Sequence, residues 1–236
     1  MEQIWEGIKE AFRLIFQGDP EIWSITLLSL KVSGVSTLIS MIIGLPLGTW
    51  LSLRSFPGKE FLISIVNTGM ALPPVVIGLW VSIFLWRSGP LGDLALIYTP
   101  TAIVIAQTII ATPMVTGLTI TALQQLPPSL RLQLLCLGAS GFQMTLSLWR
   151  EARLSLLAAL MAGFGSVISE VGASMMVGGN IRYQTRVLTT AIVLETSKGE
   201  FSTAIALGFI LLILAFLFNL ALTWVQQKAS KVNIHR

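Results

Sequence analysis

The chain has 236 residues, of which 54% are hydrophobic and only 11% charged, and its mean hydropathy is +0.81. This number of charged residues is too small to cover the surface of a soluble globule of this length. The composition therefore excludes an ordinary soluble protein and predicts a single membrane domain over residues 1–236. The net charge of +4 comes from Lys and Arg residues that stand singly between apolar runs, which argues against a nucleic-acid-binding patch.

The first twenty residues have the pattern of an amphipathic helix. Apolar side chains recur at spacings of three and four from Ile4 to Phe16, and charged residues fill the positions between them. Acidic residues interrupt the segment, which therefore lacks the apolar core of a cleavable signal peptide. We expect residues 1–20 either to lie in the membrane interface, in contact with lipid, or to pack on the outer face of the protein itself.

Five later stretches are long and apolar enough to cross a hydrocarbon layer of about 30 Å. The predicted fold class is therefore an all-α polytopic membrane protein with about five transmembrane helices. An odd number of spans places the two termini on opposite sides of the membrane. The stretches are Ile25 to Leu51, Phe61 to Trp86, Thr99 to Leu123, Leu154 to Met176 and Thr203 to Val225.

The basic residues outside these spans choose between the two orientations. They are more numerous on the side that holds the C-terminus, and most acidic residues fall on the other side. We therefore expect a multi-pass protein of the cytoplasmic membrane with its N-terminus outside and its C-terminus inside. The inner set is Arg54, Lys59, Arg131, Arg150, Arg153, Lys228, Lys231 and Arg236, and the outer set is Lys9, Arg13, Arg87, Arg182, Arg186 and Lys198.

Glycines and prolines mark special positions in the first two spans. Gly44 and Gly48 predict that the first span approaches another helix closely. The run Ala71–Pro74 must kink or break the second span, because a proline removes a backbone donor and displaces the preceding turn. Such a break either lines a transport pathway or only shapes helix packing. The candidate pathway residues here are Thr68, Leu72, Pro73 and Pro74.

Residues 124–153 form the longest expected cytoplasmic loop. Two prolines open it, Ser129 can cap a short helix that runs to about Leu137, and Gly138 can end that helix. From these residues alone, the loop is either a plain connector or a docking element for a soluble partner.

Two segments of this loop resemble the cytoplasmic signature loop of ABC importer permeases. They are Leu137–Ser140 and Leu148–Ala152, although the family's usual Glu-Ala-Ala is replaced here by Leu132-Gln133-Leu134. In that family a short coupling helix fits a groove in the ATPase subunit, so the resemblance implies that this loop, the coupling loop, docks an ATPase. The implied docking residues are Arg131, Gln133, Leu137, Gly138, Ala139, Ser140 and Phe142.

Other segments narrow the resemblance to the molybdate and tungstate branch of these permeases. Ala71–Leu79 and Ser88–Gly92 resemble the branch as a whole. Ile168–Ala173, Met176–Ile181 and Leu188–Phe201, taken in order, look like the tungstate permeases. The resemblance implies the membrane subunit of an ATP-driven tungstate importer, and the same machine carrying molybdate or sulfate is the nearest alternative.

The same resemblance implies the partners of the chain. They are a second copy of the chain, two copies of a cytoplasmic ATPase, and an external oxyanion-binding protein. ATP and magnesium would bind to the ATPase, because this chain has no Gly-x-x-x-x-Gly-Lys-Ser/Thr phosphate loop and needs no cofactor of its own. Cys136 and His235 are the only cysteine and histidine, which argues against metal sites and histidine triads. A stand-alone channel or an intramembrane enzyme is the alternative of another class.

Glu170 lies within the fourth predicted span, where a carboxylate is costly unless it is paired or hydrated. Because it would repel an oxyanion, we expect it to hydrogen-bond backbone or hydroxyl groups of a neighbouring helix, in either a gating or a packing role. The resemblance implies that residues 177–201, including a partly embedded helix between Tyr183 and Glu195, help form an external gate. Further candidate pathway or gate residues are Ser169, Glu170, Gly178, Gly179 and Asn180, the last three in a turn or an amide nest.

Overall fold

The computed structural model describes residues 5, 9, 13 and 19–234 of the chain. The amphipathic helix expected over residues 1–20 therefore lies almost entirely outside the described residues. Within residues 19–234 the regular structure is helical, without strands. The predicted all-α fold class is confirmed.

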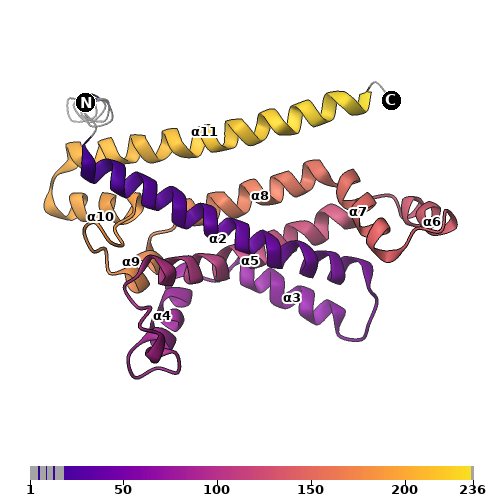
Figure 1. Cartoon of the computed structure of the whole chain (residues 1–236), viewed down its shortest axis with the longest axis horizontal. Helices are drawn as coiled ribbons and strands as arrows, with labels where there is room; N and C mark the ends of the chain where they lie inside the picture. The colour runs from indigo at the N-terminus through magenta and orange to yellow at the C-terminus, as the bar shows by residue number, and fades with distance from the viewer. Residues whose placement is uncertain (1–4, 6–8, 10–12, 14–18, 235–236) are drawn as a thin grey trace.

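Three helices are each long and apolar enough to cross a membrane, and they run lengthwise through the molecule (Figure 1). They are α2 (Pro20–Leu53), α5 (Pro100–Gln124) and α11 (Phe201–Ile234). In α11 the candidate span covers Phe201–Gln227. Asp19 caps the start of α2, because its side chain accepts hydrogen bonds from the amides of Glu21 and Ile22. Thr99 caps α5 in the same way by accepting from the amide of Ala102.

Two bent helix pairs bring the number of spans to five if each pair is counted as one. α3 (Lys59–Met70) and α4 (Pro74–Leu85) differ in direction by 97°, and α7 (Gly141–Glu151) and α8 (Arg153–Ile168) by 75°. The break between α3 and α4 lies at the double proline, as the sequence predicts. About five spans are thus present in the described part of the chain.

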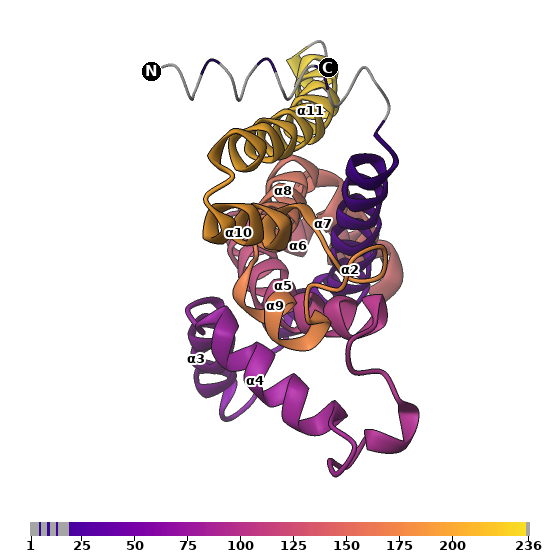
Figure 2. The same cartoon turned by 90° about the vertical axis from the view of Figure 1, so that its left-hand side faces the viewer.

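Shorter helices gather at the two ends of the bundle. α6 (Pro128–Cys136) lies at one end, and the turn Gly92–Leu94, α9 (Gly172–Gly178) and α10 (Leu188–Lys198) lie towards the other (Figure 1). Seen from its end, the bundle holds α5 near its centre, with α11 on one side and the pair α3 and α4 on the opposite side (Figure 2).

Three expectations about helix boundaries are wrong. The stretch Leu154 to Met176 is not one helix, because α8 ends at Ile168 and α9 begins at Gly172. The outer helix expected between Tyr183 and Glu195 begins only at Leu188, after a turn in which Tyr183 has a positive φ of 59°. Ser129 does not cap α6, since Pro127 occupies the N-cap position and the helix starts one residue before Ser129.

The close helix approach predicted at Gly44 and Gly48 is confirmed. A Cβ added at Gly44 would lie 2.9 Å from Cγ1 of Val115, and one at Gly48 would lie 2.7 Å from the carbonyl oxygen of Thr116. The neighbouring positions carry small hydroxyl side chains, of which Ser36 donates to the Val104 carbonyl across the same contact. Small residues therefore let α2 and α5 pack backbone to backbone.

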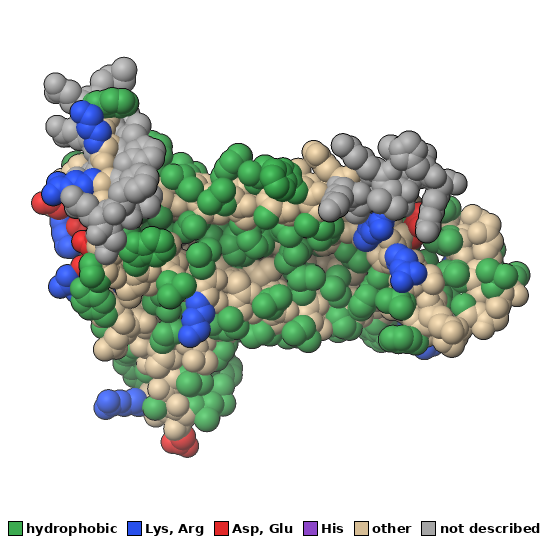
Figure 3. Space-filling model, turned by 45° about the horizontal axis from the view of Figure 1, so that its top comes forward, with side chains coloured by type: hydrophobic (Ala, Val, Ile, Leu, Met, Phe, Trp, Pro, Cys, Tyr) green, Lys and Arg blue, Asp and Glu red, His purple; other side chains and the backbone are tan. Residues whose placement is uncertain are grey.

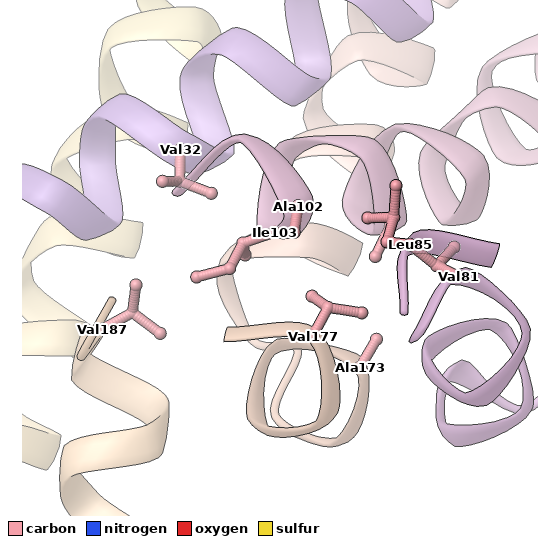
Figure 4. Close-up of a cluster of buried hydrophobic side chains, with 9 residues drawn as sticks. Val32, Val81, Leu85, Ala102, Ile103, Ala173, Val177 and Val187 are labelled. Carbon is pink, nitrogen blue, oxygen red and sulfur yellow. The ribbon is translucent and has the colours of Figure 1, made fainter. Parts of the chain in front are cut away.

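The half of the molecule that holds α4 and α9 is stabilised by a cluster of buried aliphatic side chains, most of them from four helices (Figure 4). Val32 belongs to α2, Val81 and Leu85 to α4, Ile103 to α5 and Val177 to α9. This cluster joins α4 and α9, which follow the breaks at residues 71–73 and 169–171, to the unbroken helices α2 and α5.

The surface between the two ends is mainly apolar. Hydrophobic side chains cover the middle of the face in Figure 3, and charged side chains gather towards its ends. Leu27 on α2 and Leu212 and Phe216 on α11 are each more than 60% exposed. Because so much exposed hydrocarbon is unfavourable in water, this face is suited to contact with lipid tails.

Candidate translocation pathway and coupling surface

The two helices that follow breaks at residues 71–73 and 169–171, α4 and α9, pack against each other. A Cβ added at Gly78 on α4 would lie 2.6 Å from Cα of Ala173 on α9, and one at Gly172 would lie 2.5 Å from Cγ2 of Val75. The contact begins beside both breaks, at residues 71–73 and 169–171. Two interrupted backbones therefore meet at one place, as expected where a membrane protein lines a polar route.

Glu170 starts the helix that follows its own break. Its Oε1 accepts the amide proton of Ala173 at 2.7 Å, and its Oε2 accepts both the amide and the hydroxyl protons of Ser174 at 2.9 Å. The side chain is buried, with the residue 5% exposed. Because the first amides of a helix have no intrahelical partners, this carboxyl group satisfies donors that would otherwise be buried unpaired.

Two further buried side chains complete the polar network around this break. The amide nitrogen Nε2 of Gln107 on α5 donates to the Val167 carbonyl at 3.1 Å, and the hydroxyl of Thr189 on α10 donates to the Glu170 carbonyl at 2.8 Å. Oε1 of Gln107 is buried and has no partner among the described residues. The break is therefore fixed from both sides, by α5 and by α10.

The other candidate pathway residues at the breaks are exposed. Thr68, Leu72, Pro73 and Pro74 line the break in the second span, and Ser169 lies at the break in the fourth. The hydroxyls of Thr68 and Ser169 donate to the carbonyls four residues earlier in their own helices. The structure thus leaves both break surfaces open on the single chain.

Residues Gly178–Asn180 form a turn at the end of α9. Gly179 and Asn180 have positive φ angles of 68° and 51°, whereas Gly178 is helical and buried. The Gly179 amide donates to the Met175 carbonyl at 3.0 Å, and this hydrogen bond completes the last turn of α9. The side chain of Asn180 donates to the Thr190 carbonyl at 3.3 Å, which ties the turn to α10.

An ion-pair cluster ties the following loop to the start of α2. Glu21 accepts from both Arg182 and Arg186, the latter at 3.1 Å. The hydrogen bond to Glu21, and then the attraction between the two charges, raises the pKa of the Arg182 guanidinium above its usual value. Arg186 is largely buried, and its Nε has no partner among the described residues. We refer to Glu21, Arg182 and Arg186 as the outer clamp, because the sequence predicts that these residues lie on the outer side.

The coupling loop folds into α6 and α7, joined by a tight turn. Gly138 has a φ of 73°, and its amide and that of Ala139 donate to the carbonyls of Leu135 and Leu134 at 3.0 Å each, which ends α6. Ser140 then caps α7, and its side chain and that of Gln143 form a reciprocal capping box. Gly138 thus ends the helix as predicted.

The predicted docking residues lie on α6, on the turn after it and on the first turn of α7. Arg131, Gln133, Leu137, Gly138, Ser140 and Phe142 are exposed, and Ala139 is partly buried. Leu137 is 82% exposed and Phe142 is 78% exposed, which is unusual for large apolar side chains outside a lipid-facing surface. This end of the molecule therefore presents an uncovered apolar surface suited to a protein partner.

Sequence reasoning missed several of these residues. Gln107 was visible as an amide within an apolar span, which is a recognised signal for an internal polar contact. Ser174 carried no such signal, because small hydroxyl residues are common in membrane helices. The clamp partners Glu21 and Arg182 are 161 residues apart, so no local pattern connects them.

Comparison with known families identifies the chain. Residues 41–231 match the family described as the binding-protein-dependent transport system inner membrane component. The chain belongs to this family of permeases. It is therefore a multi-pass inner-membrane protein and a transport subunit rather than an enzyme.

Individual relatives of this permease include transporters of oxyanions. A tungstate uptake permease of Peptoclostridium acidaminophilum is 37% identical, over 97% of this chain and 100% of the relative. A probable anion ABC transporter permease of Haloferax volcanii is 43% identical, over 83% of this chain and 87% of the relative. The molybdenum permease of Escherichia coli K12 is 29% identical, over 87% of this chain and 93% of the relative.

Solved structures support the fold of the permease. A chain of the MetNI methionine ABC transporter in an inward-facing conformation matches with a TM-score of 0.73. The match covers 89% of this permease and 98% of that chain, at 22% sequence identity. The arrangement of spans described above is therefore that of an ABC importer permease.

Proposed function

We propose that this permease forms the membrane pathway of an ATP-driven importer that carries tungstate into the cell. The observation that carries the proposal is its 37% identity, over the full length of the relative, to a protein named as a tungstate uptake permease. Molybdate is the second candidate cargo, favoured by the weaker likeness to a molybdenum permease.

The pathway would run between two copies of the chain. One copy leaves both break surfaces uncovered, with Thr68, Pro73 and Ser169 exposed, so a second copy facing them would enclose a route that one copy cannot. Glu170 would act by holding α9 in place rather than by touching the anion, because its carboxyl oxygens already accept three hydrogen bonds.

Movement would enter the permease through α6. The exposed residues of α6, of the turn after it and of the start of α7, among them Leu137 and Phe142, would dock on two copies of a cytoplasmic ATPase that binds ATP and magnesium. The C-terminus would then be inside and the outer clamp outside, in the gate region of residues 177–201, where an external oxyanion-binding protein would deliver its cargo. No cofactor of this chain itself is needed.

Uptake by the reconstituted importer tests this function. The permease, its ATPase and the binding protein in vesicles should accumulate radiolabelled tungstate only when ATP is supplied. Uptake without ATP, or purification of the permease without an associated ATPase, would instead favour a stand-alone channel.

Competition distinguishes the cargo. Unlabelled tungstate should suppress uptake at a lower concentration than molybdate or sulfate, and calorimetric titration of the binding protein should give the same order. Equal or stronger competition by molybdate would contradict tungstate while leaving the importer intact.

A further inference from the structure

We propose that the permease binds an anionic phospholipid in a groove beside the coupling loop. The groove has a volume of about 700 Å³ and lies between the last turns of α2 and the first turns of α7. We call it the lipid groove, and its main residues are Trp50, Leu53, Arg54, Arg131, Met144 and Trp149.

The charges of the lipid groove favour an anion. Arg54 and Arg131 both line it, and none of its described lining residues is acidic. Both arginines are exposed, and neither forms an ion pair with any part of the chain that the structure describes. A basic pocket between membrane helices at the cytoplasmic surface is a recognised site for phospholipid head groups.

The depth of the groove is marked by its aromatic residues. Trp50 is 47% exposed and its ring stacks on Phe56, with the centroids 4.7 Å apart. Trp149 points its indole N–H at Oγ1 of Thr49, 2.8 Å away. Tryptophan concentrates where hydrocarbon meets the head groups, so this groove lies at that level of the membrane.

The floor of the groove suits acyl chains rather than a free anion. Apart from the arginines, it is formed mainly by apolar side chains, among them Leu53, Met144 and the exposed Leu146. Inorganic phosphate would meet the same two cations but would leave this floor uncovered. A molecule with an anionic head and hydrocarbon tails satisfies both parts, which is why we assign the groove to a phospholipid. Two of its lining residues, Arg131 and Phe142, also belong to the proposed docking surface, so the lipid would lie beside the bound ATPase.

Native mass spectrometry of the assembled, delipidated importer tests the assignment. Dioleoyl phosphatidylglycerol should bind more tightly than phosphatidylcholine with the same chains. Since a cation near an anionic lipid contributes roughly a fivefold factor in affinity, Arg54→Gln should weaken phosphatidylglycerol binding about fivefold, and Arg54→Gln with Arg131→Gln about thirtyfold. Arg150→Gln is the matched control, because Arg150 is exposed on α7 but does not line the groove.

Several outcomes would overturn the proposal. They are equal binding of the two lipids by the assembled importer, an equal effect of Arg150→Gln, and displacement of the lipid by glycerol phosphate. If the arginine variants fail to assemble, Thr145→Trp fills the groove while keeping both cations, and it should weaken binding of both lipids. Unchanged binding in that variant would also reject the site.

Discussion

The two ends of the permease are built in different ways. At the coupling end, α6 and α7 take their boundaries from neighbouring residues, with Gly138 ending one helix and Ser140 capping the next. At the end predicted to face outside, which we call the outer end, Glu170 binds the first amides of α9. The break before this helix is held by residues of α5 and α10, far away in the sequence. Most predicted docking residues at the coupling end are exposed, whereas the Glu170 side chain is buried.

This difference matches the different requirements of a docking surface and of a helix break inside the membrane. A surface that must bind and release a moving partner needs helix ends that keep their shape while exposed, and local capping provides that. A break inside the membrane must satisfy every backbone donor from within the protein, so it depends on long-range contacts. Variants at the outer end should therefore affect stability most, and variants at the coupling end should affect transport more than stability.

The largest expected effect is that of Glu170→Ala. The change leaves two amides and one hydroxyl unpaired in a buried site, at about 1 to 3 kcal/mol each, so the permease should lose about 3 kcal/mol or more. Thermal unfolding in detergent measures this, with Glu151→Ala on the exposed part of α7 as control. Similar losses from the two changes would show that the break is not held by Glu170.

Gly78→Val should have the next largest effect. The new side chain would press against the Ala173 backbone, and overpacking of this kind costs about 1 to 3 kcal/mol. Gly165→Val on α8 is the control, since a Cβ there meets nothing within 4 Å. If the two variants unfold at the same midpoint temperature, the close contact of α4 and α9 is contradicted.

Gly138→Val should separate transport from stability. The residue has a left-handed φ of 73° with open space around it, so the cost is backbone strain of about 1 to 2 kcal/mol. We expect the variant to insert normally but to lose ATP-driven uptake, because the end of α6 changes shape. Gly141→Val, where φ is not positive, is the matched control, and full uptake by Gly138→Val would show that this turn does not couple to the ATPase.

The smallest expected effect is that of Glu21→Gln in the outer clamp. Arg182 is largely exposed, so losing the ion pairs should cost at most about 1 kcal/mol. The loss should shrink at high salt, because ions screen exposed charges. Unfolding measured at low and high salt, with exposed Glu200→Gln as control, checks this, and a salt-independent loss would indicate that buried Arg186 dominates the clamp.

Local features of the fold could be predicted because their causes are local. The break after Met70 follows from Pro73 and Pro74, and the end of α6 follows from Gly138. The break at Ser169–Val171 could not be predicted, since its apolar neighbours fit a continuous helix. It requires Glu170 to meet the amides of α9 while Gln107 and Thr189 bind the carbonyls beside it.

The sequence by itself determined that this chain lies in a membrane, where most of its apolar helices run and where the double proline interrupts the second span, because hydrophobicity and backbone freedom belong to single residues. Only the tertiary structure decided that the breaks of the second and fourth spans adjoin, that Glu21 meets Arg186, and that Arg54 and Arg131 share one groove. Each of these depends on residues distant in the chain, whose contacts form only when the helices pack.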